Sequence, residues 1–168
     1  YEVFSTKNLS GAYAASLSLQ LDQSRKMLLA EPVSAEQVYV QSLNEVLELL
    51  LLEDEISFEK FSDTFDARIS QLEKNTNSAL ALFALAEIRL QWSLVYLKFG
   101  HELDAAWNLR QSYQLVQECK KKFPEFHPIK KTSGVLEVML GSVPEKYQWV
   151  LALLGMEGST EKGLQELE

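Results

Sequence analysis

Apolar residues recur every three or four positions along most of the chain, a spacing that predicts amphipathic α-helices. The clearest stretch runs from Leu85 to Pro124, where two such patterns are joined by a tight turn at Phe99-Gly100-His101. Strict alternation of apolar and polar residues, which marks a half-buried strand, is hard to find. The pattern therefore predicts an all-α protein of antiparallel helical hairpins, stacked in a right-handed solenoid or a bundle.

The N-terminal half divides into three predicted helices. The first runs from about Ser10 to Leu29 and stops at Glu31-Pro32, because the residue before a proline is disfavoured in the α region. A capping box, Ser34 with Gln37 three residues later, begins the second helix. Its apolar positions are Val38, Val40, Leu43, Val46, Leu47, Leu50 and Leu51. The third helix extends from Ile56 to Glu73 and presents one apolar face, made of Phe58, Phe61, Phe65, Ile69 and Leu72.

Two helices in the middle of the chain carry the strongest pattern. A polar break at Asn75-Thr76-Asn77-Ser78 supplies an N-cap for a helix from Ser78 to Phe99. This helix is apolar on two sides, which predicts a core helix sandwiched between neighbours, with Trp92 buried. The next helix, Glu102 to Lys122, is predicted to pair antiparallel with it through five inward residues: Leu103, Ala106, Leu109, Tyr113 and Val116.

Shorter elements follow the proline-rich connection that begins at Phe123. Helices are predicted at Ser133 to Leu140, Pro144 to Leu154, and Ser159 to Glu168. Ser142 and Glu145 have the spacing of a second capping box. Gly141, Gly155 and Gly158 are predicted to close these elements as C-cap glycines, with positive φ at Gly141 and Gly155. The amphipathic pattern is still running at Glu168, which favours a parent protein that continues.

Length and charge narrow the classes of function. With 168 residues, the chain is predicted to be a single helical domain over residues 1–168, the N-terminal part of a longer protein. Its net charge of −8 argues against nucleic-acid binding, because phosphate contacts need clustered Lys and Arg. The basic cluster Lys120-Lys121-Lys122 fits a helix C-terminus instead. No apolar run has the length of a membrane span, so any association with an envelope would be peripheral.

Candidate catalytic chemistry is sparse. Cys119 is the only cysteine, and its position on a helix predicts a small buried apolar residue. His101 and His127 lack the spacing of a zinc site and are predicted to lie in loops. The phosphate-binding, dinucleotide-binding and serine-hydrolase glycine motifs are absent from the sequence. We therefore expect no enzymatic activity, no cofactor and no metal.

The stretch from Trp92 to Leu115 resembles a tetratricopeptide repeat. Trp92-Ser93, Tyr96, Gly100, Ala105 and Ser112 stand where that repeat has its leucine-glycine, tyrosine, turn glycine and two small residues. Leu109 stands at a large packing position. The sequence departs from the repeat at Ser93, where the close-packing glycine is expected, and in lacking the usual proline. The resemblance implies a tetratricopeptide-like stacking of hairpins.

Residues 78–168 also resemble uncharacterised helical-repeat proteins from Bacteroidota. The shared features are Phe123-Pro124-Glu125-Phe126, a glycine and a proline at positions 141 and 144, Tyr147-Gln148-Trp149, and Leu153-Leu154-Gly155. The resemblance implies an envelope-associated protein, periplasmic or at the outer membrane, and it brings no catalytic residues. The chain begins at Tyr1 rather than Met, which agrees with removal of an N-terminal signal.

The aromatic residues supply the only candidates for recognition. Most are predicted to lie in the core, but Trp107 falls outside the inward face of its helix. Trp107, Arg110 and Tyr113 are therefore the predicted partner-binding residues. The expected function is a non-catalytic helical-repeat scaffold that binds a protein or peptide. The alternatives are an accessory region of a larger enzyme and a small-ligand carrier with an aromatic pocket.

Overall fold

The computed structural model describes residues 3–168, apart from the side chain of Tyr147. In that part of the chain 76% of the residues are helical and no strand occurs, which confirms the all-α prediction. The elements are α1 (Lys7–Leu17), α2 (Leu21–Leu28), α3 (Ala35–Leu52), α4 (Glu55–Glu73), α5 (Ala79–Lys98), α6 (Glu102–Lys122), α7 (Ile129–Gly141), a 3-10 turn (Glu145–Tyr147), α8 (Gln148–Leu153) and α9 (Thr160–Leu167).

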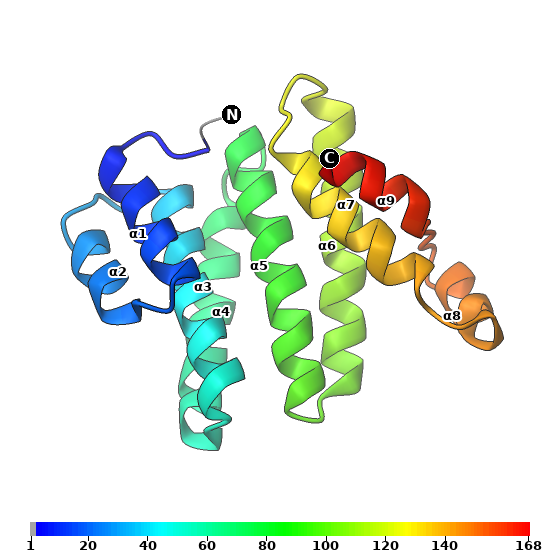
Figure 1. Ribbon diagram of the computed structural model, residues 1–168, viewed down its shortest axis with the longest axis horizontal. Helices are drawn as coiled ribbons and strands as arrows, with labels where there is room; N and C mark the ends of the chain where they lie inside the picture. Colours follow the sequence, from blue (N-terminus) through cyan, green and yellow to red (C-terminus); the bar gives the residue numbers. More distant parts are fainter. Residues whose placement is uncertain (1–2) are drawn as a thin grey trace.

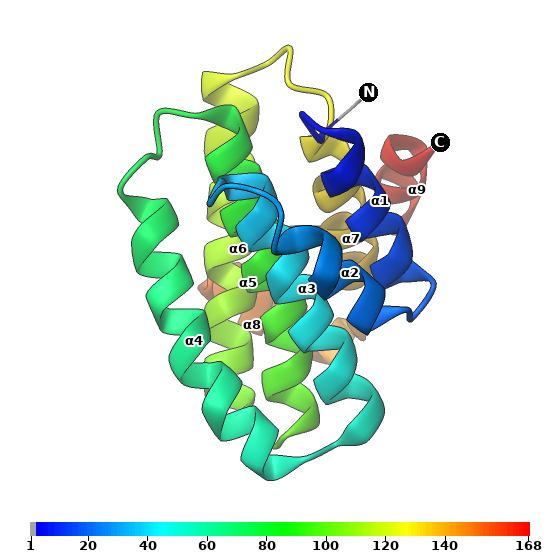
Figure 2. The ribbon, with the colours of Figure 1, turned by 90° about the vertical axis from the view of Figure 1, so that its left-hand side faces the viewer.

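The helices form layers around α3 and α5, which lie side by side in the middle of the molecule. Figure 2 shows α4 and α6 on one side of this central pair, and α1 and α7 on the other. Figure 1 shows α5 in the centre, with α1 and α7 to its left and right. Successive helices pack as hairpins, and the α5–α6 and α7–α9 pairs are in the most extensive contact.

The predicted core helix is confirmed by α5. Twelve of its residues are buried, and Trp92 is among the largest fully buried side chains. The Ser78 hydroxyl caps the helix by accepting a hydrogen bond from the Ala81 N–H, 3.4 Å away. Gly100 follows α5 with φ of +77°, as a tight turn into α6 requires. Among the described residues α5 alone is long and apolar enough to cross a membrane, but its burial is that of a core helix.

The predicted helix from Ser10 to Leu29 is wrong, because two helices occupy that stretch. The chain reverses between α1 and α2, and Leu19 takes the left-handed conformation with φ of +59°. A leucine gives no turn signal, so the sequence pattern missed the break. The reversal lets α2 pack against both α1 and α3.

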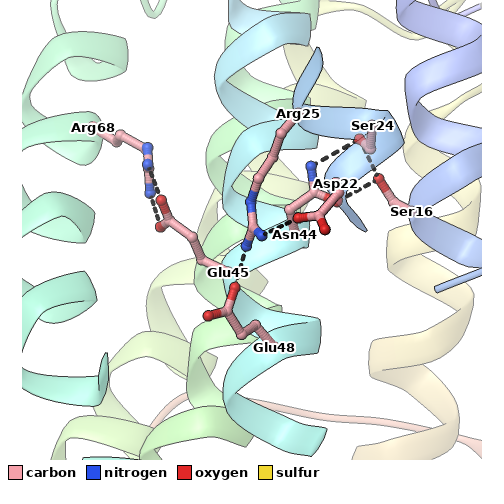
Figure 3. Close-up of polar contacts among 8 residues, drawn as sticks. All are labelled: Ser16, Asp22, Ser24, Arg25, Asn44, Glu45, Glu48 and Arg68. Atoms are coloured by element: carbon pink, nitrogen blue, oxygen red, sulfur yellow. Dashed lines mark hydrogen bonds and ion pairs between the residues drawn. The ribbon is translucent and has the colours of Figure 1, made fainter. Parts of the chain in front are cut away.

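Buried polar contacts fix this first hairpin on α3 (Figure 3). The Ser16 hydroxyl lies 2.8 Å from Asn44 Oδ1 and 3.0 Å from the Ser24 hydroxyl, and Asn44 Nδ2 donates to Ser24 at 2.8 Å. All three side chains are buried. Because an unpaired buried polar group is costly, these bonds favour a single placement of α1 and α2 on α3.

Figure 3 also shows two ion pairs that α3 makes with its neighbours. Arg68 of α4 donates to both carboxylate oxygens of Glu45, and both side chains are buried. Arg25 of α2 pairs with Glu48 nearer the surface. The sequence pattern of α3 predicts only its apolar face, and these polar partners were not predicted.

The contact face of α6 agrees only in part with the predicted one. Val116 is buried and Leu109 and Tyr113 pack against the core, as predicted, but Leu103 and Ala106 are exposed. The other buried residues of the face are Ala105, Asn108, Ser112 and Cys119. The Ser112 hydroxyl donates to the Ala86 carbonyl of α5 at 2.7 Å. Small side chains on this face let the two helices approach closely, so the large residue Leu103 remains outside. The predicted burial of Cys119 is confirmed, and burial raises the pKa of its thiol to about 11.

The C-terminal boundaries also need correction. Helix α7 begins at Ile129, four residues before the predicted Ser133. The predicted capping box at Ser142 is wrong, since Ser142 follows α7 and its hydroxyl donates back to the Val138 carbonyl at 2.7 Å. The turn at Glu145 instead begins after Pro144.

The glycines of this region have two different roles. Gly155 has φ of +68° after α8, as predicted. Gly141 ends α7 without a positive φ, so that part of its prediction is wrong. A Cβ at Gly141 would lie 2.4 Å from the Thr160 nitrogen, and one at Gly158 would lie 2.3 Å from Leu140 Cβ. These two glycines therefore permit close packing of the segment before α9 on α7.

Candidate ligand cavity

A cavity of about 590 Å³ lies between α1 and α7, over the side chains of α3 and α5. Figure 1 shows the helices that carry its lining residues, with α1 and α7 on the two sides of α5. This volume lies within the usual range for small-molecule sites. Its lining consists of Val3, Phe4, Ser5, Thr6, Lys7, Ser10, Tyr13, Tyr39, Phe83, Pro128 and Lys131.

Aromatic rings from three helices and the N-terminal segment form one wall. The Phe4 and Tyr39 rings are parallel within 6°, with centroids 6.4 Å apart. Tyr13 lies 5.1 Å from Phe4 and 5.9 Å from Tyr39. Phe83 meets Tyr39 edge-on at 5.6 Å. Tyr39 and Phe83 are buried, so the half-buried rings of Phe4 and Tyr13 supply the aromatic surface on which an apolar ligand can lie.

Lys131 of α7 lies over these rings and is held by the buried carboxylate of Glu87. Lys131 Nζ lies 2.8 Å from Glu87 Oε2 and 3.2 Å from the Tyr39 hydroxyl. Tyr39 and Thr132 also donate to Glu87, at 2.9 and 2.6 Å. Glu87 is only 4% exposed, so its charge is buried and compensated by these three groups.

The same contacts decide the protonation of the cavity groups. Burial and the adjacent Glu87 charge raise the pKa of the Tyr39 hydroxyl. Burial alone would lower the pKa of Lys131, but the Glu87 charge and hydrogen bond outweigh it, and the net direction is upward. At neutral pH Lys131 is therefore a cation and Tyr39 a neutral donor, which suits binding rather than nucleophilic or base chemistry.

Local sequence explains how these groups come together. Thr6 caps α1 by accepting a hydrogen bond from the Leu9 N–H at 3.1 Å. Just before it, the Ser5 N–H and hydroxyl both donate to Glu36 of α3, at 2.5 and 3.0 Å. These bonds hold the segment containing Phe4 over the cavity. Pro128 precedes α7 and lets the helix begin at Ile129, which brings Lys131 into its first turn.

The cavity was not predicted from the sequence, although the sequence contains one sign of its buried ion pair. Glu87 interrupts the apolar stripe of the predicted core helix, between Leu85 and Ile88. A carboxylate in such a position requires a cationic or hydrogen-bonding partner. The partner, Lys131, lies 44 residues away in the sequence. The pattern could therefore show that the Glu87 carboxylate needs a partner, but not which residue supplies it.

The three predicted partner-binding residues lie on α6, and none of them lines the cavity. The Trp107 side chain is on the outside, 54% exposed, and the Arg110 guanidinium lies 5.9 Å from its ring centroid. Arg110 Nε also donates to the Leu154 carbonyl after α8, at 3.0 Å. Tyr113 is half-buried and packs against both apolar clusters of the fold. Trp149 is also exposed, whereas the Tyr147 side chain lies outside the described part of the chain.

A second hollow of about 510 Å³ lies among α2, α3 and α4. Its charged lining includes Glu45 and Glu48, which are already paired with Arg68 and Arg25. Phe61 is its only aromatic residue. The cavity beside Lys131 is therefore the stronger candidate site.

Comparison with known proteins gives no match: no family model, curated protein or solved structure is significantly similar to this chain.

Proposed function

We propose that this protein is a non-catalytic binding protein whose ligand occupies the cavity between α1 and α7. One observation carries the proposal: four helices far apart in the sequence each contribute a side chain to one cavity. These side chains are Tyr13 of α1, Tyr39 of α3, Phe83 of α5 and Lys131 of α7. Of the functions open from the sequence, small-ligand binding is the one for which a formed pocket exists.

A cavity-filling variant tests this proposal. Ser10 lies in the lining and is exposed, so Ser10→Trp should fill the cavity without disturbing the core. Ser70→Trp is the matched control, because Ser70 is exposed on α4 and lines neither hollow. In a thermal-shift screen of small aromatic and acyl compounds, hits should stabilise wild type and Ser70→Trp but not Ser10→Trp. Hits that stabilise all three equally would contradict the proposal.

A second function, binding of a partner protein, is favoured by an exposed apolar surface on α6 and α8. Leu103 and Trp107 are exposed one helical turn apart on α6, and Trp149 and Leu153 are exposed in the same way on α8. The Arg110 bond to Leu154 joins the two helices. Exposed Trp beside Arg is a combination enriched at interface hot spots.

Site-specific crosslinking tests this second function. A photoreactive residue at position 107 should give a discrete crosslinked product in the native host. Gln114, exposed on α6 at a different position, is the matched control. Equal crosslinking from positions 107 and 114 would argue against a specific interface at Trp107.

A tetratricopeptide-like stacking of the hairpins is also part of the proposal. The helix contacts support it. The first helices of successive hairpins, α1, α3, α5 and α7, contact one another in order. Each second helix contacts the first helix of its own hairpin and that of the next: α2 contacts α1 and α3, α4 contacts α3 and α5, and α6 contacts α5 and α7. In such arrays each unit packs on its neighbours. Membership of an envelope-associated Bacteroidota family rests on the resemblance over residues 78–168 alone.

A further inference from the structure

We infer that the ligand of the cavity is a small amphipathic anion, a carboxylate with an aromatic or acyl body. This inference rests on the proposed binding function and goes on to the chemistry of the ligand. Its starting point is the lining, which among residues 3–168 contains two lysines, Lys7 and Lys131, and no Asp or Glu. The chain as a whole has 24 acidic and 16 basic residues, so a cationic lining departs from the overall composition.

The accessibility of the two charges in the pair also favours an anion. The Lys131 side chain is 45% exposed, whereas that of its partner Glu87 is 5% exposed. A ligand entering the cavity therefore meets the ammonium group and not the carboxylate. The Lys131 ammonium donates to Glu87 and to the Tyr39 hydroxyl, and the exposed part of its side chain remains open to a ligand oxygen.

The aromatic rings argue against a cationic ligand. Lys131 Nζ lies 5.7 to 5.9 Å from the ring centroids of Tyr13, Tyr39 and Phe83. Rings that would attract a ligand ammonium group by cation–π interaction already surround the protein's own cation. A second cation would also be repelled by Lys131. The ring surface therefore suits the apolar body of a ligand, which can pack on it while the anionic group of the ligand contacts Lys131.

Charge-matched probes test the inference by isothermal titration calorimetry at pH 7.5. The first set is 2-naphthoate, 2-naphthalenemethanol and 2-naphthylmethylammonium; octanoate, octanol and octylammonium form the second set, with an extended body. In at least one set the anion should bind about tenfold or more tightly than the alcohol, and the amine most weakly. Added salt should weaken binding of the anion more than binding of the alcohol.

Variants assign the charge preference to Lys131. Lys131→Met should reduce anion affinity to that of the alcohol, while Lys131→Arg should retain the preference. Because Lys131→Met leaves Glu87 buried without its cation, Glu87→Gln/Lys131→Met is measured beside it to remove both charges together. Lys121→Met is the matched control, since Lys121 is exposed and outside the lining.

The possible failures are distinguishable. If an alcohol or amine binds as tightly as its anion and Ser10→Trp abolishes that binding, the cavity is a binding site but the anion inference is wrong. If the anion preference survives both Lys131→Met and the double variant, its assignment to Lys131 is wrong. If none of the six probes binds to wild type, both the inference and the proposed small-ligand function fail.

Discussion

The indole nitrogen of Trp92 in α5 donates a hydrogen bond to the Ser42 hydroxyl of α3, 3.2 Å away. Both residues are fully buried. The Trp92 ring also lies 4.7 Å from that of Phe65 in α4. One side chain therefore connects three helices at the centre of the fold, by packing and by a satisfied polar contact.

Replacing Trp92 should strongly destabilise the protein. Trp92→Ala is expected to lower the free energy of unfolding by about 3–5 kcal/mol, as large-to-small changes in aromatic cores do. Trp107→Ala is the control, since Trp107 is 54% exposed, and it should cost less than about 1 kcal/mol. Chemical denaturation measures both. A loss below about 1 kcal/mol for Trp92→Ala would be incompatible with its burial.

The buried ion pair between Arg68 and Glu45 should behave differently from an exposed one. Arg68→Met leaves the Glu45 carboxylate buried and unpaired, at a cost of about 3–5 kcal/mol. Arg68→Met/Glu45→Met should recover most of that loss, because both charges are removed together. Arg25→Met is the control: the side chains of Arg25 and Glu48 are 39% and 22% exposed. Its loss should be below about 1 kcal/mol. A double variant no more stable than Arg68→Met would contradict this account.

Two glycines should respond to alanine for different reasons. A Cβ at Gly155 would have no heavy atom within 4 Å, so Gly155→Ala costs only the left-handed backbone conformation, about 1–2 kcal/mol. A Cβ at Gly163 would lie 2.6 Å from the Gly134 carbonyl oxygen and 2.7 Å from the Val138 nitrogen. These are backbone atoms of α7, so Gly163→Ala should cost more, about 3 kcal/mol. Thermal and chemical unfolding compare the two variants. Equal stability of wild type and Gly155→Ala would show that the end of α8 is wrongly described.

Stability should fall at alkaline pH, and Tyr39 should account for part of the fall. A raised pKa in the folded state stabilises the protein below the unfolded-state value, about 10 for tyrosine, and this stability is lost as the pH rises further. Above pH of about 10, Tyr39 should steepen the loss by up to about 1.4 kcal/mol per pH unit. The unfolding free energy of Tyr39→Phe should fall less steeply with pH than that of wild type. The measurement runs from about pH 9 to about pH 11.5, on both sides of the unfolded-state pKa of about 10. Tyr96, whose pKa burial raises to about 12, stays in the variant and continues to contribute. An unchanged slope in Tyr39→Phe would contradict the prediction.

Local signals predicted the centre of the fold well. Each of these signals depends on residues close together in the sequence: the two-sided apolar pattern, the cap at Ser78 and the turn at Gly100. Helix α5 and its turn into α6 lie where the signals predict them. The predicted face of α6 was right at Val116 and wrong at Leu103 and Ala106, because the apolar pattern alone was used to choose the inward positions. Close helix packing instead selected Ala105, Asn108 and Ser112.

The cavity was beyond the reach of such signals because its parts are joined only by tertiary contacts. Tyr39 and Lys131 are 92 residues apart, and their hydrogen bond exists only once α3 and α7 are both packed on α5. Because α7 was predicted to start at Ser133, Lys131 was expected in the loop before it, where a lysine side chain is usually exposed to solvent. In contrast, the exposure of Trp107 followed from its position on α6 and is confirmed.

Cys119 has a practical consequence for spectroscopy. It is the chain's only cysteine, it is fully buried, and its pKa of about 11 keeps it a thiol at neutral pH. The thiolate is the form that reacts with maleimides and iodoacetamides, so native protein has almost no background labelling. A single cysteine introduced at Lys130, which is exposed next to Lys131 and does not line the cavity, would therefore carry the only attached dye. Its emission would report filling and emptying of the cavity in real time, with the native sequence otherwise intact.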